Sequence, residues 1–156
     1  MRLIKCSIIF LALFSSLQSC NTIDVYEQTI ALPKHEWKSN LRLNFMADVK
    51  DSSAYYNIYF VFRHTESYHF NNIWINLTST FPKDSARTQK FNITLAKGNG
   101  WLGTSMDDII EQRLLINRQP VRLPAGTYKF SITQIMREDP LQNVLNAGIR
   151  LEKVTQ

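Results

Sequence analysis

The sequence predicts an all-β fold: an antiparallel β-sandwich of jelly-roll type, with about seven to nine strands, behind a cleaved N-terminal signal. Two observations predict it. Apolar and polar residues alternate in several segments that are rich in aromatic and β-branched side chains. Short runs of Gly, Pro, Asn, Asp and Ser separate these segments. An antiparallel sheet can bury one face and leave the other in water, which is the pattern that the alternation describes.

The alternating segments are 41–45, 55–62, 73–78, 91–95, 128–133 and 145–151. In the fifth of them, Tyr128, Phe130 and Ile132 point to one side and are expected to enter the core. Gly148 interrupts the last one. The turn signals lie at 51–53, 71–72, 82–85, 97–100 and 124–126. The last of these ends in Gly126, which suits a turn that requires a positive φ.

The segment from Met106 to Ile116 has two interpretations. Apolar residues recur with helical spacing at Met106, Ile109, Ile110 and Leu114, whereas Ile110 to Ile116 can equally alternate as a strand. A strand after a loop is the preferred interpretation, because the surrounding segments are all β.

The first residues are typical of an export signal. Arg2 and Lys5 precede an apolar stretch that is too short to span a membrane as a helix. The stretch ends in Leu17-Gln18-Ser19-Cys20, which fits a lipobox, the motif in which a cysteine receives a diacylglyceryl group. An ordinary secretory signal with a chance cysteine is the alternative. The expected organisation is a lipoprotein signal peptide at 1–19 and lipidation of Cys20.

The remaining chain has the length of one domain. Residues 20–34 contain few apolar side chains and are expected to form a lipidated N-terminal tether, with a strand as one option. Residues 35–156 are expected to form a single β-sandwich domain. A tether of that length, fully extended, reaches roughly 50 Å from the membrane.

Cysteine usage and charge narrow the possible chemistry. The chain has two cysteines. Cys6 leaves with the signal and Cys20 is consumed by lipid, so the mature protein has no thiol for a disulfide, for catalysis or for zinc. The formal charge of +5 falls to +3 without Arg2 and Lys5, and the other cations are scattered. A solvated surface is therefore expected, and binding to nucleic acid is not.

The three histidines show no metal-ligand spacing. His64 and His69 are five residues apart, which would place them on opposite faces of a strand. His35 stands beside Glu36 with no further ligand at a suitable distance in the sequence. All three are expected to be exposed or hydrogen-bonded loop histidines, and no metal site is predicted.

The acidic cluster of Asp107, Asp108 and Glu111 could in principle serve acid–base chemistry or calcium binding. The spacing of an oxygen-rich calcium loop is absent, so a solvated or loop-ordering role is expected. No nucleophile elbow, phosphate loop or dinucleotide fingerprint occurs. The sequence therefore nominates no catalytic residue and no cofactor, and the protein is not expected to be an enzyme.

The tryptophans admit two interpretations. Trp37, Trp74 and Trp101 could form a platform that stacks against sugars, or they could fill the core of a sandwich, which is the preferred interpretation. Trp101 lies in a glycine-flanked loop and is expected to be the most exposed of the three.

Several short motifs, taken in order, resemble the gliding-motility lipoprotein H family (GldH) of Bacteroidetes. They are Arg63-His64, Tyr68-His69-Phe70, Asn72-Ile73-Trp74, Gly100-Trp101-Leu102-Gly103, the stretch 126–137 that ends in Gln134-Ile135-Met136-Arg137, and the stretch 145–153 that contains Gly148-Ile149-Arg150-Leu151. The resemblance covers the whole chain, including the cysteine of the lipobox.

The resemblance implies a non-enzymatic outer-membrane lipoprotein that takes part in gliding motility and in the associated type IX secretion machinery as a structural or assembly component. It carries over no catalytic residue and only Cys20 as a site. The implied partners are the membrane, through the lipid, and other gliding or secretion lipoproteins of the envelope. Trp101, Arg63 and Arg137 are candidates to face a partner. A glycan-binding envelope lipoprotein that uses exposed aromatics is the alternative.

Two further features concern location and modification. Asn21 follows the cysteine in place of the aspartate that retains some lipoproteins at the inner membrane, so the outer membrane is favoured. Asp24 is the one acidic residue in the segment 21–24, which favours the periplasmic leaflet over surface export. Asp84-Ser85-Ala86 resembles an acceptor for O-glycosylation in Bacteroidetes, with Ser85 as the candidate site.

Overall fold

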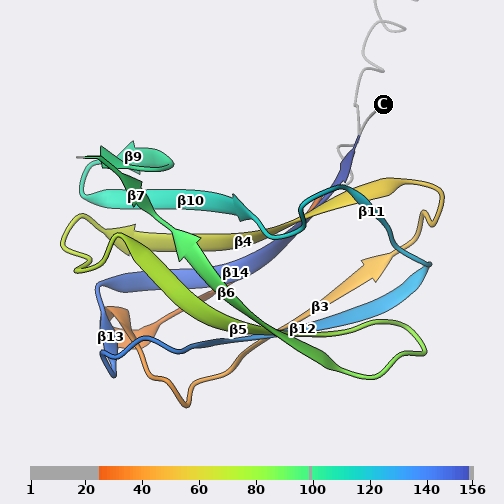
Figure 1. Cartoon of the computed structure of the whole chain (residues 1–156), viewed down its shortest axis with the longest axis horizontal. Coiled ribbons are helices and arrows are strands. Elements are labelled where there is room, and N and C mark those ends of the chain that lie inside the picture. Colours follow the sequence, from red (N-terminus) through yellow and green to blue (C-terminus); the bar gives the residue numbers. More distant parts are fainter. Residues whose placement is uncertain (1–24, 99, 155–156) are drawn as a thin grey trace, which may run out of the picture.

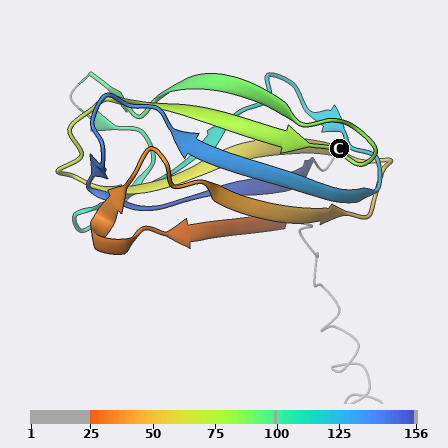
Figure 2. The ribbon, with the colours of Figure 1, turned by 90° about the horizontal axis from the view of Figure 1, so that it is seen from below.

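The computed structural model describes residues 25–98 and 100–154. These residues form two facing antiparallel sheets, which appear as two layers in Figure 1 and Figure 2. The predicted antiparallel sandwich is therefore confirmed. Eight strands have seven or more residues, and the others are short. Within the described ranges, no helix is long and apolar enough to cross a membrane.

The first sheet has the order β1-β14-β4-β10-β9, with β11 paired to β4 beyond the end of β10. Its strands are β1 (Val25–Ala31), β4 (Tyr55–Thr65), β9 (Thr104–Met106), β10 (Ile109–Leu115), β11 (Val121–Arg122) and β14 (Val144–Val154). The second sheet has the order β3-β12-β5-β6. Its strands are β3 (Leu43–Val49), β5 (Asn72–Thr80), β6 (Arg87–Thr94) and β12 (Gly126–Gln134).

Two small ribbons and one helical turn complete the fold. They are β2 (Glu36–Trp37) paired with β13 (Leu141–Gln142), β7 (Ala96–Lys97) paired with β8 (Gly100–Trp101), and the 3-10 turn η2 (Pro33–His35). We call the end of the sandwich that holds Val25, Tyr55 and Val154 the proximal end, and the opposite end, where β4 and β12 finish, the distal end (Figure 1).

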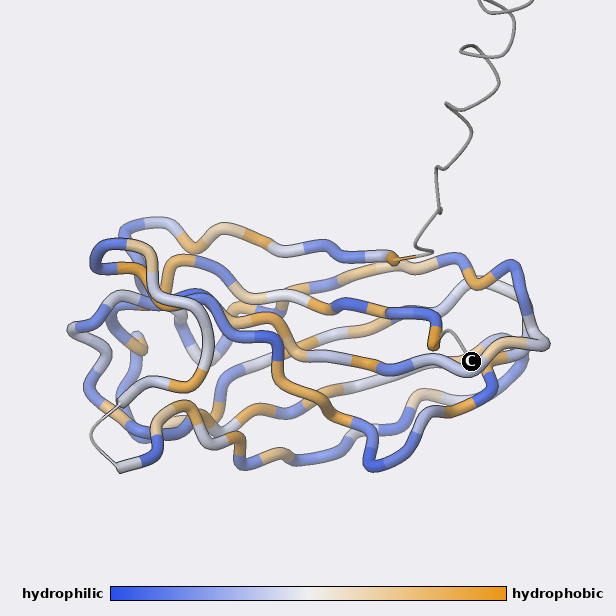
Figure 3. The backbone as a smooth tube through the Cα atoms, turned by 90° about the horizontal axis from the view of Figure 1, so that it is seen from above, coloured by the Kyte–Doolittle hydropathy of each residue, from blue (hydrophilic) through white to orange (hydrophobic). Residues whose placement is uncertain are grey.

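The core lies between the sheets and follows the predicted alternation, which is visible along the strands in Figure 3. In β3, Leu43, Phe45, Ala47 and Val49 are buried and the residues between them are exposed. The same alternation in β12 buries Tyr128, Phe130 and Ile132, the three residues predicted to enter the core. Each fully buried large apolar side chain contributes about 1.5–3 kcal/mol through removal of its surface from water.

The segment from Met106 to Ile116 contains a strand, as the preferred interpretation predicted. Strands β9 and β10 form a hairpin, in which Ile109 pairs with Met106. Asp107 turns the chain with a φ of 53°, a conformation that aspartate tolerates better than most residues. The acidic pair Asp107 and Asp108 therefore forms the tip of the hairpin.

The predicted positive φ at Gly126 is confirmed, at 145°. A side chain there would also be obstructed, because an added Cβ would lie 2.7 Å from Cγ of Pro82. Gly126 thus lets the connection into β12 pass close to the β5–β6 loop.

Strand β1 occupies about half of the segment 20–34 that was expected to be a tether. It pairs with β14 over its whole length, from Val25 opposite Glu152 to Ala31 opposite Asn146. The sheet therefore begins five residue steps after Cys20, and an extended chain covers roughly 18 Å over that distance. The predicted signal peptide, Cys20 itself and residues 21–24 lie outside the described residues.

Candidate functional site

The distal end holds an aromatic cluster around His64. The His64 ring centroid lies 4.5 Å from that of Trp101 and 5.1 Å from that of Tyr68. His64 is fully buried, because β4 continues to Thr65 and alternate residues of the strand face the core. The expectation of a loop histidine is therefore wrong for His64. The sequence pattern of alternating aromatic residues ends at Phe62, so it did not indicate that the strand continues and that His64 also faces the core.

Hydrogen bonds determine the protonation state of His64. Its Nδ1 lies 2.8 Å from the carbonyl oxygen of Thr65, and its Nε2 lies 3.2 Å from the amide nitrogen of Gln112. A carbonyl only accepts, so Nδ1 carries the proton and Nε2 accepts from Gln112. Burial lowers the pKa of His64 and so favours this neutral form. The same amide nitrogen donates to the carbonyl of Leu95 at 3.1 Å, which ties β4 and β10 to the loop after β6.

The tryptophans do not form a sugar-stacking platform. Trp37 is fully buried, and its indole nitrogen donates to the carbonyl of Leu41 at 3.0 Å. Trp74 is half-buried under the Lys90 ammonium, which lies 4.7 Å from the ring centroid. Trp101 is also half-buried, with its ring against His64. The glycan-binding alternative required two aromatics that lie coplanar and exposed on one face. Trp37 is buried and Trp74 and Trp101 are each half-buried, so none of the three tryptophans is exposed in the way that such a platform requires.

A chain of alternating charges crosses the outer face of the first sheet. Arg63 pairs with Glu111, Glu111 with Arg113 at 2.6 Å, Arg113 with Glu27 at 3.0 Å, Glu27 with Arg150 at 2.8 Å and Arg150 with Glu152 at 2.9 Å. We call these six residues the charge ladder. It joins β10, β4, β14 and β1, and it covers Val61, which faces outward and is nevertheless buried.

Two residues singled out from the sequence, Arg63 and Glu111, are members of the charge ladder. The Arg63 guanidinium lowers the pKa of Glu111, and Arg113 lowers the pKa of Glu27, each chiefly through a side-chain hydrogen bond. Glu111 therefore pairs with two arginines of the charge ladder, although it lines the same cavity as Asp107 and Asp108. Arg63, a candidate to face a partner, has an intramolecular partner. No sequence pattern identified Glu27, because its partners Arg113 and Arg150 lie 86 and 123 positions away in the chain.

The distal end also exposes apolar side chains. Leu102 is 39% exposed and Met106 is 75% exposed. Met106 lines a cavity of about 370 Å³, whose other lining residues are Arg63, Thr104, Asp107, Asp108, Ile109, Glu111 and Arg113. Arg137 follows the distal end of β12, is exposed, and forms no ion pair with any residue that the structure describes. The three partner-facing candidates therefore share one end of the sandwich, although Arg137 does not contact the other two.

The remaining sequence candidates lie apart. His69 follows β4 instead of sharing a strand with His64, and its Nδ1 lies 3.1 Å from the Glu138 carboxylate. No group of three or more histidine, cysteine or acidic side chains among the described residues could hold a metal ion. Ser85 is exposed in the β5–β6 loop, and its backbone N–H donates to Asp84 at 2.8 Å.

Comparison with solved structures gives only distant likenesses. The VP2 protein of infectious bursal disease virus, in its subviral particle, overlaps 86% of this chain at 19% identity with a TM-score of 0.38. A chain of the T13 viral particle of IBDV gives 14% identity over 86% of this chain and a TM-score of 0.37. This chain spans about a third of each viral chain, 34% and 32%. Likenesses at this level carry no functional inference.

Comparison of sequences gives a clear family. The gliding motility lipoprotein GldH homologue of Christiangramia forsetii is 29% identical over 149 residues, which cover 90% of this chain and 89% of the homologue. The gliding motility lipoprotein GldH of Flavobacterium johnsoniae is 27% identical over 158 residues, which cover 96% and 98%. The profile of the GldH lipoprotein family matches residues 24–151, most of the chain. This protein therefore belongs to the GldH lipoprotein family.

Proposed function

We propose that this protein is a non-enzymatic outer-membrane lipoprotein that serves gliding motility and the associated type IX secretion machinery as a structural or assembly component. The observation that carries the proposal is the family match over residues 24–151. The near full-length relatives, both named for gliding motility, support it. The anchor is lipid on Cys20, and the periplasmic leaflet is the proposed location.

The distal end is the proposed contact surface for other envelope proteins of the same machinery. Exposed apolar side chains, an arginine and a half-buried aromatic on one end of a domain are residue types that interfaces favour. Met106 and Leu102 supply the apolar part, and Arg137 supplies a cation that is free to pair with a partner's carboxylate. The buried cluster around His64 gives the loop of Trp101 a rigid base.

Deletion and complementation test this proposal. Loss of the gene should abolish colony spreading and the secretion of C-terminally targeted cargo, and the wild-type gene should restore both. Met106→Asp should restore them poorly, because a carboxylate replaces an exposed apolar contact. Met46→Asp is the matched control, since Met46 is 61% exposed on β3 at a distance from the distal end.

Normal spreading and normal secretion in the deletion strain would refute the proposed function. Equal complementation by the two methionine variants would refute the distal contact surface alone. The anchor is tested separately: Cys20→Ala should abolish incorporation of a labelled fatty acid and shift the protein to the soluble fraction.

A further inference from the structure

The proximal end of the sandwich carries cations that have no acidic partner. Lys50 follows β3, Lys83 lies in the β5–β6 loop, and Arg122 ends β11. All three side chains are exposed. None forms an ion pair with another residue in the described part of the chain.

The acidic residues of the same end are already satisfied. Asp51 pairs with Lys153 at 2.6 Å, and Asp84 pairs with Arg87 at 3.1 Å. Asp48 accepts a hydrogen bond from a threonine of β12 at 2.7 Å. The Lys153 hydrogen bond is the main cause that lowers the pKa of Asp51, so this carboxylate stays ionised and bound to its own cation. The local excess of charge is therefore positive.

Exposed aromatic side chains stand beside these cations. Tyr55 is 37% exposed and Phe81 is 36% exposed. The Arg122 guanidinium lies over the Tyr55 ring, 5.0 Å from its centroid. Aromatic rings next to lysine and arginine are the composition found where proteins meet the headgroup region of a bilayer.

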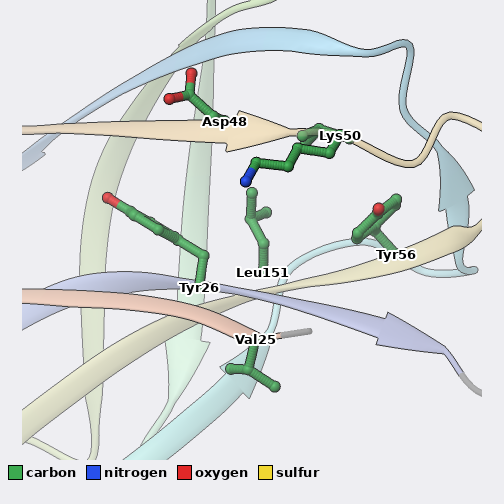
Figure 4. Close-up of a pocket in the computed structure, with 7 residues that line it drawn as sticks. Val25, Tyr26, Asp48, Lys50, Tyr56 and Leu151 are labelled. Atoms are coloured by element: carbon green, nitrogen blue, oxygen red, sulfur yellow. The ribbon is translucent and has the colours of Figure 1, made fainter. Parts of the chain in front are cut away.

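A small cavity opens at the same end between β1 and β3 (Figure 4). Its volume is about 220 Å³, and Val25, Leu151 and Tyr56 contribute to its lining. Figure 4 shows the Lys50 amino group over Leu151. The cavity thus combines apolar side chains with the Lys50 cation and the Asp48 carboxylate, which offsets one of the three unpaired cations.

The covalent connection brings this end to the membrane. Val25, the first residue of β1, lies five residue steps after Cys20, so the proximal end stays within roughly 18 Å of the lipidated residue. The distal end lies beyond the full length of β4, whose 11 residues span roughly 35 Å.

We propose that the proximal end docks on the phosphate-bearing surface of the bilayer that holds the lipid on Cys20, with Lys50, Lys83 and Arg122 against lipid phosphates and Tyr55 and Phe81 among the headgroups. The proposal rests on the anchoring stated under the proposed function and adds an orientation to it. The distal end then points away from the membrane. Each cation at an anionic surface favours the docked state about fivefold.

A matched pair of labels measures the orientation. The mature chain has no cysteine besides the acylated Cys20, so one introduced thiol can be labelled selectively. Ser52 and Ser67 lie in exposed turns, Ser52 before β4 at the proximal end and Ser67 after β4 at the distal end, and each is replaced by cysteine in turn. Full-length lipidated protein is placed in phosphatidylcholine vesicles that contain phosphatidylglycerol and a headgroup nitroxide. A fluorophore at residue 52 should be quenched, and one at residue 67 should not.

Charge-reversed variants separate docking from tethering. The proximal variant combines Lys50→Glu, Lys83→Glu and Arg122→Glu. It should lower quenching at residue 52 to the level seen in vesicles without phosphatidylglycerol. Its melting temperature should stay unchanged, which shows that the fold is intact. The distal set of Lys34→Glu, Lys97→Glu and Arg137→Glu changes the net charge equally and should leave the quenching unchanged.

Three results would overturn the docked orientation. The first is equal quenching at residue 52 in the wild type, in the proximal variant and in vesicles without anionic lipid, because the tether alone would explain that result. Quenching at residue 67 equal to that at residue 52 would show that the domain has no fixed orientation. A glycan on Ser85, detected by mass spectrometry, would separate the Lys83 loop from the bilayer. Failed lipidation would appear differently, as loss of the protein from the vesicles.

Discussion

Replacement of Gly148 by alanine should destabilise the domain by detaching β1. Gly148 is buried in β14, opposite Thr29 of β1 on one side and Val61 of β4 on the other. An added Cβ would lie 2.2 Å from the carbonyl oxygen of Gln28 and 2.8 Å from Cα of Thr29. Both contacts are with backbone, so a side-chain rotation cannot relieve them. Strand β1 must move away from β14.

The magnitude follows from two contributions. Overpacking of a buried position costs about 1–3 kcal/mol. Displacement of β1 weakens ladder hydrogen bonds, each worth about 1 kcal/mol. The free energy of unfolding should therefore fall by about 2–4 kcal/mol, a large share of the roughly 5–15 kcal/mol typical of a domain. For a domain of this size the melting temperature should fall by about 8–15 °C.

Urea and thermal unfolding, followed by circular dichroism on the chain from residue 21 onward, measure this loss. Gly100→Ala is the matched control, because an added Cβ at Gly100 meets no heavy atom within 4 Å. The control should stay within about 0.5 kcal/mol of wild type. A Gly148→Ala protein as stable as wild type, or a control that loses as much stability, would refute the reasoning.

The other predictions concern burial, pH and charge. His64 is held neutral by burial, so its pKa is lower in the folded than in the unfolded state and the unfolded state binds more protons. Stability should therefore fall as the pH drops below about 6.5, by at most about 1.4 kcal/mol per pH unit, and urea midpoints should depend less on pH in His64→Phe. Arg113→Met should lower the free energy of unfolding by about 0.5–1 kcal/mol at low salt and by less at high salt, because it removes an ion pair with Glu27. Lys129→Met removes an exposed cation on β12 and should show no such salt dependence. Equal salt dependence of the two variants would count against the charge ladder. Trp37→Ala should lower the free energy of chemical unfolding by about 3–5 kcal/mol, and Trp74→Ala should lower it clearly less. A larger loss in Trp74→Ala than in Trp37→Ala would contradict the burial of Trp37.

Local pattern was sufficient for the strands and for part of the site. Alternation with period two is a property of neighbouring residues, so Tyr128, Phe130 and Ile132 identified the inner face of β12 without knowledge of its partners. The turn at Gly126 was equally local, since it depends on one backbone angle. The hairpin of β9 and β10 was harder, because its short apolar run suits a helix and a strand alike.

The residues of the proposed distal contact surface were only partly predictable. Trp101, Arg63 and Arg137 were nominated from short motifs, and the fold does bring them to one end. The expectation that Trp101 is the most exposed tryptophan relied on the glycines beside it. Trp101 is half-buried, as Trp74 is, and its ring packs on His64, whose burial depends on how far β4 continues.

The sequence by itself determined the strand pattern and the family, and it predicted the cysteine at the end of a signal, because each depends on short motifs of neighbouring residues. Only the tertiary structure decided that β1 joins the sheet five residues after Cys20, since its partner β14 lies at the other end of the chain. That pairing shortens the expected tether from roughly 50 Å to roughly 18 Å. It also places Glu27 beside Arg113 and Arg150, and it sets the start of β1 at the end of the sandwich that carries the unpaired cations, which is the basis of the proposed docked orientation.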